Sequence, residues 1–228
     1  MAHKEQGYRF RIDYDFDHCK GVINNIEQMV VILVNTEIQK DQVVMNFNNV
    51  KKIVDSAKNI TVMDCSCRKD LKRCNAPIET CMTFDETAEK LLETDDARIR
   101  SYNPHPVSYE EAMKVLRMSA DAGLVHLLYW GKDQEKPDTV CSCCSCCYEN
   151  LGSFLRFGLA PQLLKASAKT VVDASKCANC GTCIDRCHFG ARKMVNEILE
   201  YDPDRCFGCG LCVSTCPNNA ISLNQFSI

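Results

Sequence analysis

The spacing of apolar residues changes once between positions 48 and 63. Up to Ala57 the apolar positions recur at helical intervals, whereas the segment Ile60–Met63 after Asn59 is short and rich in β-branched residues. The pattern therefore predicts a helix followed by a short strand. This strand would deliver Cys65 and Cys67, and residues two apart point to the same face of a strand.

Two later segments carry the signature of a helix N-terminus, in which Ser or Thr is followed three residues later by Glu. Thr83 and Glu86 predict one helix, and Ser108 and Glu111 predict a second one that Gly123 ends. The expected inner face of the second helix holds Ala112, Val115, Leu116 and Ser119. The order helix, strand, helix, helix predicts an α+β domain whose loops carry the cysteines.

An apolar segment, residues 150–168, is interrupted by Gly158 and Pro161. We interpret it as a packed connection between two domains. The predicted domains are residues 1–168, a cysteine-rich domain of helical or mixed structure, and residues 169–228, a pseudo-twofold module. The expected fold class is α+β.

The chain holds 18 cysteines among 228 residues, more than packing alone would use. Disulfides in secreted domains and metal-bound thiolates in reducing compartments both consume cysteine at this density. The first residues show no signal-peptide pattern, and no apolar run approaches the roughly 18–20 residues of a membrane span. We therefore expect a cytoplasmic protein with metal-bound cysteines, from an anaerobic host.

The formal net charge of -3 gives no basic patch for nucleic acid or for an anionic membrane. The sequence also lacks a glycine-rich fingerprint for a nucleotide, flavin or nicotinamide, and a C-x3-C-x2-C run for radical chemistry. We expect neither a nucleic-acid partner nor membrane insertion. Any redox function would depend on an external donor and acceptor, while the oligomeric state stays open.

The C-terminal eight cysteines form two C-x2-C-x2-C-x3-C runs. The first contains Cys177, Cys180, Cys183 and Cys187, and the second contains Cys206, Cys209, Cys212 and Cys216. Three thiolates two residues apart on a turning loop can reach three corners of a 4Fe-4S cubane. Each run also follows a strand-like lead and precedes a short apolar tail, so the module is an internal repeat.

These runs resemble the bacterial two-cluster ferredoxins, in which the fourth cysteine of each run ligates the other cluster. The resemblance implies two 4Fe-4S clusters. Cys177, Cys180, Cys183 and Cys216 would bind one, and Cys206, Cys209, Cys212 and Cys187 would bind the other. The usual proline after the first run is replaced by His188, which we expect at the surface or facing a sulfide rather than as a ligand.

A second group of cysteines follows the predicted strand and comprises Cys65, Cys67, Cys74 and Cys81. Four thiolates so placed suit a third 4Fe-4S cluster or a tetrahedral zinc ion. Four basic residues nearby would offset their charge, namely Arg68, Lys69, Lys72 and Arg73. Four unligated thiols are the alternative. Cys19 stands alone, and we interpret it as a buried small hydrophobe.

The third group packs five cysteines into seven residues: Cys141, Cys143, Cys144, Cys146 and Cys147. They are too many for one cubane, too close for two independent cubanes, and too tight for a ladder of disulfides. Some of them would complete a site begun by the second group, or hold a possible fourth cluster with one spare, redox-active thiol. His126 lies in an apolar run, where a core residue is favoured over a cluster ligand or proton donor.

The upstream arrangement resembles a group of 4Fe-4S binding proteins from anaerobic bacteria and archaea. The resemblance runs from the four cysteines between Cys65 and Cys81, together with Pro77, through Gly123–His126 and the Cys141–Cys147 segment to the ferredoxin module. It implies a multi-cluster redox protein and no particular substrate. Tyr148 stands where a further cysteine is expected in that group.

Three functions compete. The first is an electron-transfer protein that passes low-potential electrons between a donor and a partner redox enzyme through two ferredoxin cubanes and an additional N-terminal cluster. The second is a reductase of a disulfide or small molecule, with an active site built from the Cys141–Cys147 segment. The third is a zinc-containing adaptor that docks a ferredoxin module to a larger redox complex.

Overall fold

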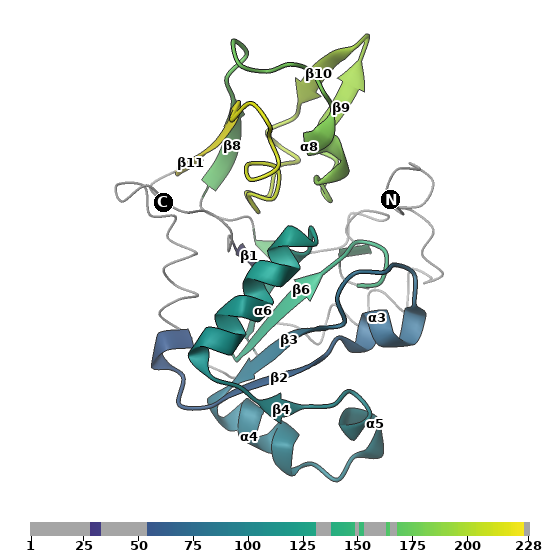
Figure 1. Ribbon diagram of the computed structural model, residues 1–228, viewed down its shortest axis with the longest axis vertical. Helices are drawn as coiled ribbons and strands as arrows, with labels where there is room; N and C mark the ends of the chain where they lie inside the picture. The colour runs from purple at the N-terminus through teal and green to yellow at the C-terminus, as the bar shows by residue number, and fades with distance from the viewer. Residues whose placement is uncertain are drawn as a thin grey trace.

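The computed structural model describes residues 28–32, 54–130, 138–148, 151–152, 163–164 and 168–225. Figure 1 shows two parts. The lower part is a sheet with its helices, and the upper part is smaller and contains the strands from β8 (Ala168–Val172) to β11 (Ile221–Gln225). Cys19 and most of the apolar connection lie outside the described residues, so the interpretation of both stays a prediction.

The lower part is built on a seven-stranded sheet. In spatial order its strands are β4 (His105–Pro106), β2 (Ile60–Asp64), β3 (Glu79–Phe84), β6 (Thr139–Cys143), β5 (Val125–Trp130), β1 (Gln28–Ile32) and β7 (Leu163–Leu164). Neighbours are antiparallel except β1 and β7, which are parallel. The register places Cys81 of β3 opposite Cys141 of β6, and Cys143 opposite Val125 of β5.

Helix α6 (Tyr109–Asp121) covers one face of this sheet (Figure 1). Its buried residues share one apolar cluster with alternate residues of β2, β3, β5 and β6: Val62, Met82, Phe84, Ala112, Met113, Val115, Leu116, Leu128 and Val140. The neighbouring residue Thr61 reaches α4 (Asp85–Glu93), where its hydroxyl donates to the Ala88 carbonyl at 3.3 Å. The sheet is therefore enclosed by helices where β2 and β3 pass.

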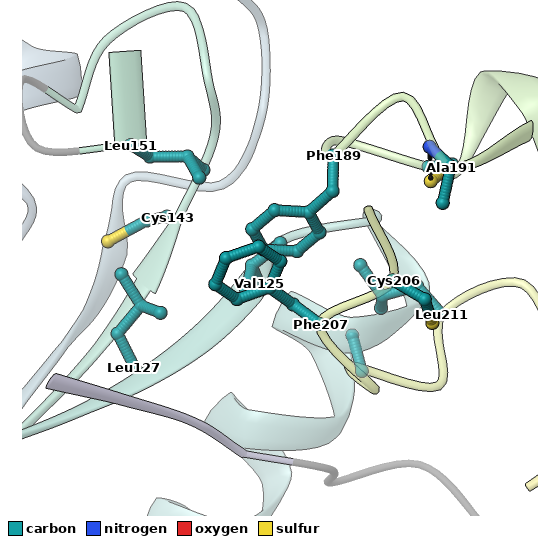
Figure 2. Packing of buried hydrophobic residues seen from close by; sticks show 11 residues of the cluster. Val125, Leu127, Cys143, Leu151, Phe189, Ala191, Cys206, Phe207 and Leu211 are labelled. Carbon is teal, nitrogen blue, oxygen red and sulfur yellow. Dashed lines mark hydrogen bonds between the residues drawn. The ribbon is translucent and has the colours of Figure 1, made fainter. Parts of the chain in front are cut away.

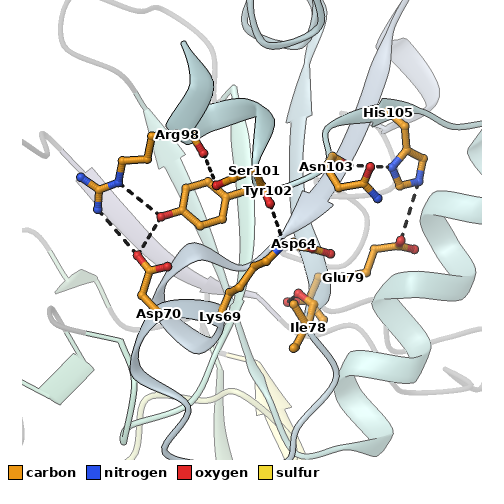
Figure 3. Close-up of polar contacts among 11 residues, drawn as sticks. Asp64, Lys69, Asp70, Ile78, Glu79, Arg98, Ser101, Tyr102, Asn103 and His105 are labelled. Atoms are coloured by element: carbon orange, nitrogen blue, oxygen red, sulfur yellow. Dashed lines mark hydrogen bonds and ion pairs between the residues drawn. The ribbon is translucent and has the colours of Figure 1, made fainter.

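Polar contacts fix the short helix α3 (Ser66–Leu71), which starts beside Cys65, against the loop that follows α5 (Ala97–Arg100). The Tyr102 hydroxyl donates to Asp70 at 2.7 Å, and the Tyr102 carbonyl accepts from the Asp64 amide at 2.8 Å. Lys69 donates to Asp64 at 2.7 Å (Figure 3). This network holds the segment that presents the first cysteines.

The predicted strand at 60–63 and the two helices predicted after it are confirmed as β2, α4 and α6. Of the helix predicted before the strand, residues 54–56 are helical, and the part before residue 54 lies outside the described residues. The Ser108 capping box is confirmed, since the Ser108 hydroxyl accepts from the Glu111 amide and the Glu111 carboxylate accepts from the Ser108 amide. The Thr83 capping box is wrong: Thr83 is buried in β3, and the cap residue Phe84 makes no side-chain bond.

The mixed α/β arrangement is confirmed in coarse form, but the sheet is larger than the single predicted strand. β5 is apolar apart from His126 and so shows no alternation, and β3 and β6 contain cysteines at positions where alternation would require clearly apolar or clearly polar residues. These strands were therefore missed by the pattern of apolar positions. The Cys141 segment, expected as a loop, is half strand: β6 carries Cys141 and Cys143, and a turn carries Cys146 and Cys147.

Ser108→Ala should destabilise the protein by about 1 kcal/mol, because it removes the acceptor for the orphan amide of Glu111. The midpoint of thermal unfolding of the anaerobic protein should then fall by roughly 2–4 °C. Arg117→Ala, on the exposed side of the same helix, is the matched control and should change stability by less than about 0.5 kcal/mol. Equal shifts in the two variants would contradict a capping role.

The upper part consists of two small antiparallel sheets, β8 (Ala168–Val172) with β11 (Ile221–Gln225), and β9 (Arg192–Val195) with β10 (Ile198–Tyr201). The strand-like leads predicted before the cysteine runs are β8 and β10. Each lead pairs with the strand that follows the other run, which is the arrangement a pseudo-twofold repeat produces. The helix α8 (Thr182–Asp185) follows the first cysteines of run one (Figure 1).

An apolar cluster joins the two parts. Phe189 and Phe207 stack with ring centroids 4.4 Å apart and pack with Val125 and Leu127 of β5. Figure 2 shows the two rings between Cys143 and Leu151 on one side and Cys206 and Leu211 on the other. The packing is therefore continuous across the predicted domain boundary at 168/169, which itself stays a prediction.

Candidate metal centres

The first pocket of the C-terminal part is ringed by cysteines from both runs. Its lining includes Cys177, Cys180 and Cys183 of the first run and Cys216 of the second, around an empty volume of about 330 Å³. Cys180 is exposed, whereas Cys183 is buried at the start of α8. The fourth thiol thus comes from the other run, as the resemblance implied.

The second pocket repeats this pattern with the runs exchanged. Its lining includes Cys206, Cys209 and Cys212 of the second run and Cys187 of the first, around an empty volume of about 300 Å³. Burial raises the pKa of Cys212 to about 11 even though the charge of Arg192 opposes this shift. A thiol in this position favours becoming a thiolate only when a cation is beside it, and a metal supplies one.

The fourth cysteine of each run makes the same backbone contact. The amide of Ala191 donates to the Cys187 sulfur at 3.3 Å, and the amide of Ala220 donates to the Cys216 sulfur at 3.2 Å. In both cases the donor lies four residues after the acceptor. Such N–H···S bonds stabilise thiolate ligands and help set cluster potentials. The fourth cysteine therefore has the same backbone environment in both halves of the module.

A buried arginine that no sequence pattern indicated, Arg192, lines the second pocket and is also near enough to Cys183 of the first pocket to be influenced by its charge. Arg192 is 3 % exposed, donates to the Thr170 hydroxyl at 2.8 Å and lies over the Tyr201 ring at 4.6 Å. Burial opposes its charge, but the thiolates of Cys212 and Cys183 raise the pKa of Arg192 overall. It is a fixed positive charge between the two sets of thiols. A lone arginine in a strand gives no sequence signal for such a role.

Two segments of this part match models of the 4Fe-4S binding domain, residues 199–222 and residues 174–190. The matches support a ferredoxin-like, iron-sulfur C-terminal region. They also support an electron-transfer role. A comparison with curated proteins found no match to the chain. The 4Fe-4S models cover one cysteine run each and leave the nine described cysteines of the N-terminal part untouched.

The residues present fit two cubanes. Each pocket offers four thiols together with apolar and glycine residues, such as Ile221 and Pro217 at the first and Phe189 and Gly208 at the second, and the second pocket adds the positive charges of Arg186 and Arg192. When bound, a 4Fe-4S cluster accepts and donates single electrons. The assignment of individual cysteines as ligands of the two cubanes stays a prediction.

The N-terminal cysteines gather into two groups that the sequence did not separate in this way. The Cys65 group contains Cys65, Cys67, Cys81, Cys141 and Cys143. Hydrogen bonds with Cys67 and Cys81 lower the pKa of Cys65 to about 3, and the nearby Arg68 adds to this shift. Burial raises the pKa of Cys143 to about 12. The five thiols of the Cys65 group therefore lie close enough together to influence one another's pKa values.

The Cys74 group contains Cys74, Cys144, Cys146 and Cys147, whose sulfurs all lie within 4.8 Å of one another. Cys144, Cys146 and Cys147 are buried and Cys74 is half-buried. Hydrogen bonds from Cys146, Cys147 and Cys74 lower the pKa of Cys144 far below that of a free thiol. Leu124 and Leu71 pack around the group and shield it from water.

The expectation that the four cysteines from Cys65 to Cys81 share one site is corrected by this arrangement. α3 and its left-handed cap Lys72 (φ 50°) turn the chain away from β2, so that Cys74 meets the turn after β6 instead. The open interpretation that the Cys141 segment completes a site begun by the earlier group agrees with the geometry. It does so twice, once in each group.

Arg68 lies between the two groups. It is 2 % exposed, and its guanidinium donates to the Pro77 carbonyl at 2.9 Å, the Ser142 carbonyl at 2.8 Å and the Thr80 hydroxyl. Burial opposes its charge, but the thiolates of Cys65 and Cys144 raise the pKa of Arg68 overall. Of the four basic residues expected to offset thiolate charge, Arg68 is the buried one.

The two histidines have different outcomes. His126 is a core residue, 2 % exposed, with Nδ1 2.9 Å from the Ser142 hydroxyl and Nε2 without a hydrogen-bond partner among the described residues. Burial lowers the pKa of His126 to about 3, so the ring is neutral. His188 is not at the surface: it is 5 % exposed, with Nε2 2.6 Å from the Gly123 carbonyl.

His188 and Arg186 tie the first cysteine run to the lower part. His188 Nδ1 lies 3.2 Å from the Ser145 hydroxyl, and Arg186 donates to the carbonyls of Ala120 and Asp121 at the end of α6. Gly123 (φ +81°) is required here, because a Cβ would lie 2.7 Å from the Arg186 guanidinium. A proline in place of His188 could not make these side-chain bonds.

Tyr148, which stands where a further cysteine was expected, offers no thiol to either group. Its hydroxyl accepts a hydrogen bond from Tyr129, and the two rings meet edge to face with centroids 6.4 Å apart. Burial raises the pKa of both phenols.

In the described part of the chain, no helix is long and apolar enough to cross a membrane.

Proposed function

We propose that this protein is an iron-sulfur electron carrier that passes low-potential electrons between an external donor and a partner redox enzyme. The observation that carries the proposal is the pair of pockets, each ringed by three cysteines of one run and the fourth cysteine of the other. The exchanged fourth ligand ties both halves together and keeps two clusters adjacent. No catalytic group is required for this role.

The exposure of the cysteines supports a direction for the route. Cys180 is exposed at the first pocket, so a docked protein can approach that cluster closely. The second pocket faces the lower part, since its walls include Phe189 and Arg186, which contact β5 and α6. An electron entering at the first cluster would therefore move inward to the second.

From the second cluster, the electron would pass to the Cys65 group. Cys143 belongs to the same apolar cluster as Cys187 and Cys206, with the Phe189 and Phe207 rings packed among them (Figure 2). The Cys65 group offers five thiols, of which a third 4Fe-4S cluster would use four. The fifth would be the spare thiol that a reductase needs, so the reductase alternative rests on this same group.

Iron content and reversible reduction test the proposal together. The full chain, purified without oxygen, should contain about eight irons from the two C-terminal cubanes, and about twelve if the Cys65 group also holds one. A redox titration should show separate one-electron steps, with one step lost in Cys180→Ala and a different step lost in Cys209→Ala. The double variant with Cys81→Ala and Cys141→Ala leaves three of the five thiols of the Cys65 group, so it should lower the iron content from about twelve to about eight and leave both C-terminal steps in place.

Iron that cannot be reduced reversibly would contradict the electron-transfer function. An iron content of about eight in wild-type protein and in the double variant alike would contradict the third cluster and leave the two-cluster carrier standing. Turnover of a disulfide by the reduced protein, abolished in Cys143→Ala, would replace the carrier proposal by the reductase alternative.

A further inference from the structure

The sulfurs of the Cys74 group are separated by distances that match one tetrahedral ion. Cys74 lies 3.7 Å from Cys144 and 3.9 Å from Cys147, and Cys146 lies 3.8 Å from Cys147. With metal–sulfur bonds of about 2.3 Å, a tetrahedral zinc ion separates its ligand sulfurs by about 3.8 Å. These three edges, with all four sulfurs within 4.8 Å of one another, therefore fit a single central ion.

The C-terminal thiols of the same molecule provide an internal comparison. Their two sets of four each line a pocket, so there is room between the thiols for a four-iron core. The four sulfurs of the Cys74 group instead lie within 4.8 Å of one another. Among the described residues, this is the one group of three or more potential metal ligands that lie so close together. The contrast separates a one-ion site from a cubane site.

The surroundings of the Cys74 group suit a closed structural site. Three of its thiols are buried, and Leu124, Leu71 and Ala76 pack against them, so no coordination position is open to a substrate. All four donors are cysteine sulfurs, and a closed set of four cysteine ligands is typical of structural zinc. Arg68 is close enough for the Cys144 thiolate to raise its pKa, and Arg73 donates to the Cys146 carbonyl at 3.4 Å.

We propose that Cys74, Cys144, Cys146 and Cys147 bind one zinc ion that cross-links the segment after α3 to the turn after β6. The four thiols bind as thiolates and release their protons to solvent, with no change in oxidation state. The ion joins positions 70 to 73 residues apart in the chain. It holds the turn that contains Ser145, the hydrogen-bond partner of His188. The zinc therefore fixes the surface on which the first ferredoxin run docks, and it carries no electron.

X-ray absorption at the zinc edge tests the site in the unmodified full chain, purified without oxygen from a medium containing both zinc and iron. The expected result is about one zinc per chain with four sulfur neighbours at about 2.3 Å. Nitrogen or oxygen neighbours, mononuclear iron in place of zinc, or no zinc would overturn the proposal. The measurement needs no variant, so it stands even if a cysteine replacement prevents folding.

A matched pair of variants assigns the ligands. Cys74→Ala should lose its zinc and keep the C-terminal iron, whereas Cys67→Ala should keep its zinc. The two cysteines are only seven residues apart in the chain, so the comparison tests the separation into two groups. Zinc loss in both variants would overturn the separation into two groups. Because the carrier proposal is judged by iron and reversible reduction, and this one by zinc and its sulfur shell, either can fail alone.

Discussion

Cys187→Ala should remove the cluster bound by Cys206, Cys209 and Cys212 and leave the other C-terminal cluster in place. The reason is that Cys187 lines the second pocket, not the pocket of its own run. About four irons should be lost, which is one cubane. Alanine is preferred over serine, because a serine oxygen could replace the lost sulfur. Electron paramagnetic resonance of the reduced protein should then show one cluster signal without coupling to a neighbour.

Comparison between variants makes the exchange of ligands decisive. The spectrum of Cys187→Ala should match that of Cys209→Ala, which loses a ligand of the second run, and should differ from that of Cys180→Ala. In the same way Cys216→Ala should match Cys180→Ala, since Cys216 and Cys180 line the first pocket. If each fourth cysteine instead reproduced the loss of its own run, the exchanged ligand assignment would be refuted.

Arg68→Met should destabilise the protein by about 3 kcal/mol, because it leaves buried thiolates without their nearest cation and two buried carbonyls without a donor. For a chain of this size the midpoint of thermal unfolding should fall by roughly 6–12 °C. Methionine keeps most of the side-chain volume, so the loss reports on charge and hydrogen bonds rather than on a cavity.

Two further variants separate the causes. Lys72→Met removes an exposed charge from the same short segment and should change stability by less than about 0.5 kcal/mol. Arg68→Lys keeps the charge but lacks the planar fork that reaches Pro77 and Ser142 in different directions, so its midpoint should lie between those of wild type and Arg68→Met. A shift in Arg68→Met no larger than that in Lys72→Met would show that Arg68 is not the compensating charge.

The local elements were predictable where one residue type decides them. The Ser108 capping box and the buried face of α6 follow from residues within one or two turns of each other, and both are found. Thr83 carried the same signature and lies in a strand, because burial of β3 against the sheet outweighed the cap. His188 was expected at the surface or facing a sulfide, yet it is buried, and its partners Gly123 and Ser145 lie 65 and 43 residues away in the chain.

The iron-sulfur character of the last sixty residues could be predicted from the sequence alone, because three thiols of each predicted ligand set fall within seven residues on one loop, and both runs match models of the 4Fe-4S binding domain. The grouping of the nine described thiols upstream was decided by the tertiary structure alone. It depends on β3 pairing with β6 in the register that sets Cys81 opposite Cys141, and on α3 carrying Cys74 to Cys144. A shift of one residue in that pairing would turn Cys141 and Cys143 to the other face of the sheet. Such a register joins strands far apart in the chain, and no local spacing of cysteines encodes it.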